Sequence, residues 1–165
     1  MFNFWSPSHI NNLKRLPKIY GAEINLNPIG IFTPFVTAIH CIDPETHTPP
    51  TQSVDSLDLG YFKEINGLQI GLLNFDPTII NGLDINLTGS FMSVTNGVTI
   101  SGVLNKHYII NGVTLASIGN HDSKCNGVQI GLINSCKDLK GIQLGLWNKN
   151  QKRSLPIINW CFKKE

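Results

Sequence analysis

The sequence predicts an all-β repeat protein, and three observations lead to this fold class. A unit that begins with a turn dipeptide repeats six times, at Asn66-Gly67, Asn81-Gly82, Asn96-Gly97, Asn111-Gly112, Asn126-Gly127 and, after a shorter unit, Lys140-Gly141. Each unit continues with alternating apolar and polar residues, which is the period of a β-strand. A second, shorter apolar segment precedes the next Asn-Gly. We therefore expect a repeat β-solenoid of about six 15-residue coils, with a cap at each end.

One alternative architecture fits the same repeat. In an antiparallel β-meander, each Asn-Gly would form a type I′ hairpin turn. The near-constant period, the aligned apolar rows and the asparagines at the first and ninth positions favour the solenoid. Stacked Asn side chains can hydrogen-bond from rung to rung there, and Asn tolerates the backbone of such corners. In a solenoid, Ile85 and Ile100 would be neighbours at about 4.8 Å, whereas a meander would place them about twice as far apart.

The parts of the single domain follow in chain order. Residues 1–65 are expected to form an N-terminal cap with degenerate strands, because GAEINL (21–26) echoes GLDINL (82–87) of the repeat. Residues 66–150 form the repeat region, whose one short unit is expected to lose its residue in the turn around 135–139. Residues 151–165 form the C-terminal cap, and four apolar side chains there would close the last coil: Leu155, Ile158, Trp160 and Phe162.

The alternation also predicts which side chains are buried. We expect the fifth position of each unit to form one buried apolar row of Ile70, Ile85, Ile100, Leu115, Ile130 and Leu144. The fourth position should then face outward as a flat polar row of Gln69, Asp84, Thr99, Thr114, Gln129 and Gln143. On this interpretation, replacing Ile100 by Ala destabilises the protein and replacing Thr99 by Ala costs little.

Composition limits the class of partner and the compartment. The 165 residues include 13 basic and 11 acidic side chains without a basic cluster, which argues against nucleic-acid binding. The N-terminus does not match a secretory signal, and no apolar run is long enough for a membrane-spanning helix. The chain is therefore expected to be cytoplasmic if Met1 is the native start. Its 4 cysteines are too sparse for a disulfide framework and are expected to be buried, reduced thiols.

Three units carry a recognisable motif. GLQIGLLN (67–74), GVQIGLIN (127–134) and GIQLGLWN (141–148) share the pattern Gly-apolar-Gln-apolar-Gly-apolar-apolar-Asn. In this the repeat region resembles a family of bacterial surface-repeat proteins, and the closing LPIINWCF (155–162) is similar to an ending found on such proteins. The resemblance implies a place at the cell envelope or surface. It implies no catalytic activity, so no functional residue carries over from it.

One set of chemically active side chains emerges only when the repeat is folded. Stacking would place His121 beside Cys136, and His107 beside Asp122, in the turns of successive coils. Imidazole, thiolate and carboxylate together could bind a transition metal, and a Cys-His pair could act as a nucleophile. The alternative is that these turns collect polar residues because they face water. No other catalytic or cofactor-binding motif is present, so we expect no cofactor.

These observations predict a non-enzymatic structural or protein-interaction module. Its flat β-repeat surface would bind a protein partner or a second copy of the chain, and not nucleic acid. One alternative is an outer-membrane-associated β-protein, which the alternation in 155–162 and the terminal aromatic Phe162 favour. A metal-binding or Cys/His hydrolytic site on the repeat turns is the third interpretation.

Overall fold

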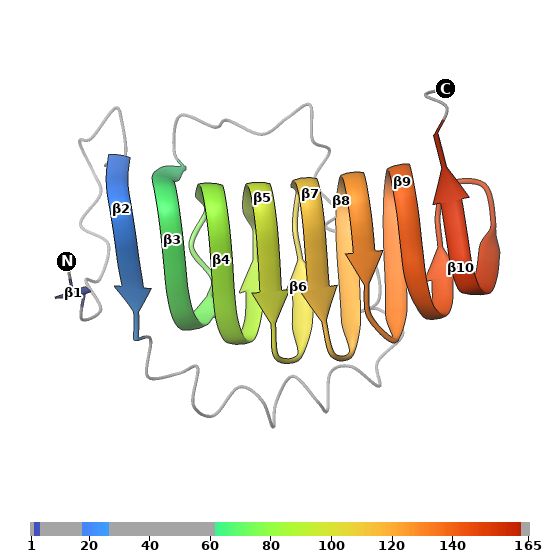
Figure 1. Ribbon diagram of the computed structural model, residues 1–165, viewed down its shortest axis with the longest axis horizontal. Coiled ribbons are helices and arrows are strands. Elements are labelled where there is room, and N and C mark those ends of the chain that lie inside the picture. Colours follow the sequence, from blue (N-terminus) through green and yellow to red (C-terminus); the bar gives the residue numbers. More distant parts are fainter. Residues whose placement is uncertain (1, 4–17, 27–61, 163–165) are drawn as a thin grey trace.

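The protein folds as a β-solenoid, as predicted. The computed structural model describes residues 2–3, 18–26 and 62–162, and its strands lie side by side along one axis, with the N-terminal strands at one end and β10 at the other (Figure 1). Along the main path of the sheet the order is β1-β2-β3-β4-β5-β7-β8-β9-β10. Every pair on this path is parallel except β9 with β10. Parallel stacking of successive units excludes the hairpin meander.

The strands cover most of the described chain. Their bounds are β1 (Phe2–Asn3), β2 (Lys18–Asn25), β3 (Lys63–Asn74), β4 (Thr78–Phe91), β5 (Ser93–Ser101), β6 (Leu104–Lys106), β7 (Ile109–Ala116), β8 (Gly119–Ile130), β9 (Ile133–Lys149) and β10 (Ser154–Cys161). The short strand β6 belongs to the second wall of the solenoid, where it pairs with β4 and β8.

The register follows the repeat. Ile85 pairs with Ile100, so residues 15 apart are neighbours on adjacent rungs. The predicted degenerate strand is also confirmed, because β2 pairs in register with β3 and Gly21 lies beside Gly67. The coil therefore begins one strand before the first Asn-Gly.

The missing residue of the short unit lies elsewhere than predicted. Leu115 pairs with Ile130 at a spacing of 15, whereas Gly119 pairs with Ile133 at a spacing of 14. The deletion thus falls in the corner at residues 131–132 and not at 135–139. This corner belongs to the sequence Gly-Leu-Ile-Asn, which turns with one residue fewer than the corner of the preceding coil.

The predicted faces are inverted, and this is the main correction to the sequence analysis. The fourth-position side chains, from Gln69 to Gln143, are fully buried. The fifth-position row that was expected to form the core points outward, and Ile100 is 38% exposed. Alternation alone shows that two faces differ, but not which of them is inside.

Stacking explains how a polar interior is stable. Asn105 Nδ2 donates to Asn120 Oδ1 at 3.1 Å, and Asn120 Nδ2 donates to Asn134 Oδ1 at 2.9 Å. The amides of Asn134 and Asn148 continue this ladder at 2.8 Å. Because each of these four amides meets its equivalent on the next rung, they satisfy one another, and their burial is not penalised as it would be without partners.

The small residues at the sixth position make room for this ladder. A Cβ atom on Gly145 would lie 2.6 Å from Nδ2 of Asn134, and one on Gly131 would lie 2.9 Å from Nδ2 of Asn120. The pair of a small sixth residue and an inward asparagine is therefore one packing unit. It accounts for the Gly and Asn of the Gly-Leu-x-Asn motif.

An apolar row lines one side of the interior. It consists of the residues that precede the Asn-Gly or Lys-Gly dipeptides, except for the polar Thr95, and its fully buried members are Ile65, Ile80, Ile110, Cys125 and Leu139. Cys125, Cys136 and Cys161 are buried and form no disulfide with one another, as expected for reduced thiols, whereas Cys41 lies outside the described residues. The core is thus a narrow apolar row beside polar ladders.

The C-terminal strand closes the solenoid by its backbone. β10 runs antiparallel to β9 and turns Asn159 and Cys161 inward, whereas Ile158 and Trp160 remain more than two-fifths exposed. The prediction that apolar side chains of this segment close the last coil is therefore wrong, for the same reason as the inverted core. The remainder of the predicted caps, at residues 1, 4–17, 27–61 and 163–165, lies outside the described part of the chain.

Candidate functional site

The outer wall of the solenoid presents two apolar rows, which we call the apolar stripe. The first row consists of Ile24, Ile70, Ile85, Ile100, Leu115, Ile130, Leu144 and Ile158, paired in register across eight strands. The second row consists of Ala22, Leu68, Leu83, Val98, Val113, Val128, Ile142 and Trp160. Both rows lie on one face because side chains two residues apart in a strand point the same way.

The stripe is open to solvent. Seven of the eight side chains in its first row are between 36% and 43% exposed, and Ile85 is half-buried. In a stack of strands, the neighbouring rungs cover part of each side chain, and its outward half remains exposed. A continuous exposed apolar surface of this extent is typical of an interaction site.

A ladder of asparagines borders the stripe on one side. Asn81 Nδ2 donates to Asn66 Oδ1 at 2.8 Å, and Asn96, Asn111 and Asn126 each continue the ladder at 2.7 Å. This confirms the rung-to-rung hydrogen bonds expected of the first repeat position. The stripe therefore has an ordered polar margin along this side.

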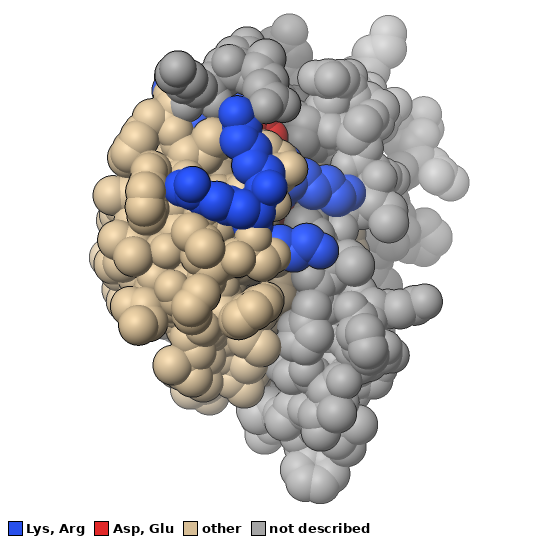
Figure 2. Space-filling view, turned by 90° about the vertical axis from the view of Figure 1, so that its right-hand side faces the viewer, with Lys and Arg blue, Asp and Glu red and all other residues tan. Residues whose placement is uncertain are grey.

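Charged residues gather at the C-terminal end of the solenoid and are absent from the two rows of the stripe. The described residues 137–162 carry five basic side chains, Lys137, Lys140, Lys149, Lys152 and Arg153, against one acidic side chain. Figure 2 looks at this end of the molecule and shows Lys and Arg side chains clustered on it. The guanidinium of Arg153 lies 4.4 Å from the ring centre of Trp160, so an exposed aromatic residue belongs to the same patch.

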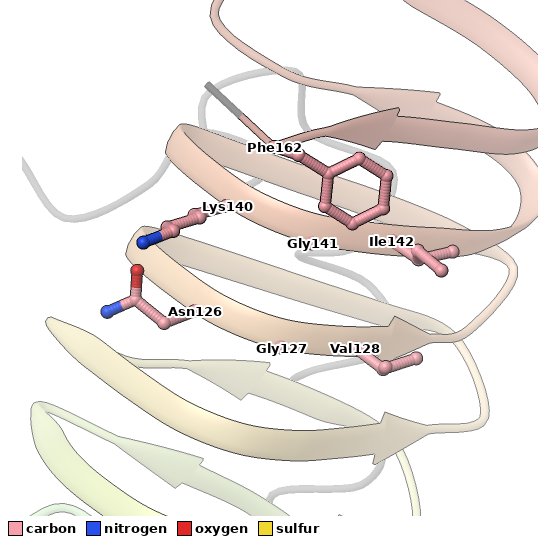
Figure 3. A pocket seen from close by; sticks show the side chains of 7 residues that line it. All are labelled: Asn126, Gly127, Val128, Lys140, Gly141, Ile142 and Phe162. Carbon is pink, nitrogen blue, oxygen red and sulfur yellow. The ribbon is translucent and has the colours of Figure 1, made fainter. Parts of the chain in front are cut away.

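A shallow hollow lies where the stripe meets this basic end. It has a volume of about 500 Å³ and is lined by Asn126, Gly127, Val128, Lys140, Gly141, Ile142 and Phe162 (Figure 3). The two glycines contribute no side chain, and the ring of Phe162 lies beside Ile142, while Lys140 and Asn126 point to the other side. The hollow extends the apolar stripe and is not an enclosed catalytic pocket.

The predicted turn cluster is only partly brought together. His107 Nδ1 lies 2.8 Å from Asp122 Oδ1, which confirms that these two are neighbours. His121 pairs in register with Ser135, and Cys136 lies opposite Asp122, because the deletion at 131–132 shifts this wall by one residue. The pairing of His121 with Cys136 is therefore wrong.

These residues also lack the setting of a metal or catalytic site. His107, His121, Asp122 and Cys136 are buried, and the described residues contain no group of three or more His, Cys, Asp or Glu side chains that could hold a metal ion. The second oxygen of Asp122 accepts a hydrogen bond from Gln129 Nε2 at 2.7 Å, so Asp122 joins the interior network. The Cys136 thiol points at the carbonyl of Ser123, 3.9 Å away.

Two buried acids of the interior have raised pKa values. The pKa of the Cys125 thiol is raised by its hydrogen bond with Cys136 and by burial, which disfavours the reactive thiolate. The pKa of the Asp84 carboxyl is raised by burial, and contacts with Ser90, His107 and Asn86 offset this only in part. Both groups are enclosed by the stacked coils, so we find no role for them toward an external substrate.

The comparisons with known proteins add no relative. No protein-family model matches the chain, and neither a curated protein nor a solved structure shows significant similarity to it. Among the described residues, no helix is long and apolar enough to span a bilayer.

Sequence reasoning missed the apolar stripe itself, because it placed these residues in the core. One signal in the sequence could have revealed the inversion. Asparagine recurs after each small sixth residue, at the ninth or tenth position of the unit. A small residue followed by an asparagine at this spacing is a packing pair that suits a narrow interior.

Proposed function

We propose that the protein is a non-enzymatic interaction module that binds a protein partner through the apolar stripe. The observation that carries this proposal is the row of eight in-register strands whose Ile and Leu side chains remain exposed. The fold uses polar ladders for its own interior, so these apolar residues are not needed to fill the core. Binding a partner would remove them from water.

The absence of a convergent catalytic set among the described residues supports the non-enzymatic part of the proposal. The histidines, cysteines and acids that sequence analysis singled out are buried within the stack. We also propose a location at the bacterial cell envelope or surface, which rests on the resemblance of the repeat motif alone.

Affinity capture with the immobilised full chain tests the interaction module. Wild type should retain a defined set of proteins, and Ile100→Lys should lose it, because a charge in mid-stripe must be desolvated on binding. Phe75→Lys is the matched control, since Phe75 is 44% exposed but lies in a turn outside the stripe. Equal capture by all three proteins would contradict the proposal.

A second candidate function is association with an envelope lipid surface, and the basic C-terminal end favours it. Trp147 and Phe162 are exposed in the same segment, 137–162, as the exposed Lys149 and Lys152, and aromatic rings with basic residues suit the interface of an anionic bilayer. Wild type should then sediment with vesicles of anionic phospholipid. Lys149→Glu with Lys152→Glu should abolish this, whereas Lys18→Glu, which lies in β2 at the opposite end of the sheet, should not.

A further inference from the structure

We infer that the apolar stripe binds a second copy of this chain, face to face and with the two solenoid axes antiparallel. This inference rests on the proposed function and names its partner. It would form a two-sheet sandwich, in which two apolar sheet faces pack about 10 Å apart.

The size of the surface fits such a dimer. Eight strands at about 4.8 Å give the stripe a length of about 34 Å, and the first seven repeat positions span about 20 Å. Each copy would then bury roughly 700 Å², or roughly 1,400 Å² in total, which is within the range of stable protein interfaces. The apolar rows would form the interface core, and the asparagine ladder would form its polar rim.

The repeat makes the surface self-complementary. The side chains of both copies would recur at the same interval of about 4.8 Å, so the ridges of one copy fit between those of the other along the whole stripe. Neither row contains a charged residue that would be buried without a partner. A different protein would need the same spacing to fill the surface equally well.

The distribution of charge selects the antiparallel arrangement. Residues 137–162 carry five basic and one acidic side chain, whereas residues 18–26 and 62–136 carry four basic and five acidic, of which Glu23, Asp84 and Asp122 are buried. Parallel axes would place two basic ends together. Antiparallel axes place the two basic ends at opposite ends of the dimer, where they do not repel each other, and this arrangement also has the two-fold symmetry of a closed dimer.

The basic residues argue against a bilayer as the occupant of the stripe. They are concentrated at one end, so attraction to anionic lipid would act at that end and not along the eight strands. A lipid surface is therefore one of the outcomes that the experiment must separate from the dimer.

Sedimentation velocity of the full chain over a range of concentrations tests the inference. Wild type and Phe75→Lys should sediment as dimers, and Ile100→Lys should raise the dimer dissociation constant by about a hundred-fold. If Ile100→Lys does not fold, judged by circular dichroism, the double variant Ile100→Thr, Leu115→Thr replaces it. This variant keeps strand propensity and should raise the dissociation constant by about ten-fold.

Three results would overturn the inference, and they affect the proposed function differently. If the wild type is a monomer and captures another protein that Ile100→Lys does not capture, a second copy of the chain is excluded as the partner. The proposed interaction module would then stand. A wild-type monomer that binds anionic vesicles through the stripe would replace the protein partner by lipid. A dimer of unchanged affinity in both stripe variants would show that the stripe is not the interface.

Discussion

At the scale of single residues, the stacking of adjacent rungs decides which amino acids the repeat requires. The second position is Gly in every coil, with φ values between +137° and +153° from Gly67 to Gly141. A side chain there would also enter the rung below. A Cβ atom on Gly97 would lie 2.0 Å from the carbonyl oxygen of Gly82. The glycine is thus required by both backbone conformation and the close approach of adjacent rungs.

Gly97→Ala should therefore be among the most destabilising single substitutions. We expect a loss of about 3 kcal/mol or more in the free energy of unfolding, measured by urea denaturation, because the neighbouring backbone must move. Gly21→Ala is the matched control, since its φ is +109° but a Cβ atom there meets nothing within 4 Å. It should cost about 1–2 kcal/mol, from backbone strain alone. Equal losses would show that contact with the next rung is not the cause.

Asp84 should make the protein less stable as the pH rises. Burial raises the pKa of Asp84 in the folded state, so the folded protein holds this proton more tightly than the unfolded chain does. The contribution of this carboxyl to the free energy of unfolding is zero below the ordinary pKa of an aspartate. It becomes increasingly unfavourable as the pH rises from that value through the raised pKa. Asp84→Asn keeps an oxygen to accept the hydrogen bond from Asn86 Nδ2, which is 2.7 Å long in wild type.

Urea denaturation of both proteins at a series of pH values tests this. Asp84→Asn should be more stable than wild type by about 1–3 kcal/mol at neutral pH, and the difference should vanish at about pH 3. A variant that is less stable than wild type at neutral pH would show that the ionised carboxylate is favourable where it lies.

At the scale of elements, the inner asparagine ladder stabilises the coil corners, whereas the outer ladder faces water. The side chain of Asn120 is fully buried and takes part in four hydrogen bonds, to Asn105, Thr114, Asn134 and the carbonyl of Ile130. Asn111 has the same chemistry on the outer face, where it donates to Asn96 and is exposed. Water can replace lost partners only at the outer ladder.

Asn120→Ala should accordingly cost about 3 kcal/mol in the free energy of unfolding, and Asn111→Ala less than about 1 kcal/mol. Thermal and urea unfolding of the two variants, which remove the same group, measure the difference. Similar losses at both positions would mean that the interior of the solenoid is as well solvated as its surface.

The repeat predicted some features of these elements correctly and others wrongly, and both outcomes have a physical reason. The 15-residue interval predicted the strands, their parallel register and the outer Asn ladder, because stacking in register repeats one geometry for every coil. The interior was assigned to the wrong side, since the expectation that Ile100 is buried assumes a core that needs apolar filling. A narrow stack instead places Thr beside Thr, Gln beside Gln and Asn beside Asn on adjacent rungs. The one-residue shift at 131–132, which separates His121 from Cys136, also left no mark in the alternation.

At the scale of the whole molecule, each coil contacts mainly its two neighbours, so stability should be a sum over coils and their interfaces. Strand β3 pairs with β4 and β4 with β5 in the same register over the Asn-Gly positions, with Asn66, Asn81 and Asn96 in one row. If one whole coil is removed, the two ends of the chain that are joined should therefore lie at the same position in their repeat units. The coil 81–95 suits this best, because it carries the buried Asp84 and the strained Met92, whose φ is +53°.

Deletion of residues 81–95 should give a shorter protein with the same fold. Thr99 would then stack on Gln69, and Asn105 on Asn74, so that the inner ladder continues without Ser90 between its asparagines. Circular dichroism should retain the β-sheet spectrum, and urea unfolding should remain cooperative with a smaller dependence on denaturant, since less surface is buried. Deletion of residues 82–95 is the control, because the single extra residue in the strand turns its side chains to the opposite face downstream. This protein should not fold, and if it were as stable as the first deletion, the register would not be set by the alternation of buried polar and exposed apolar rows.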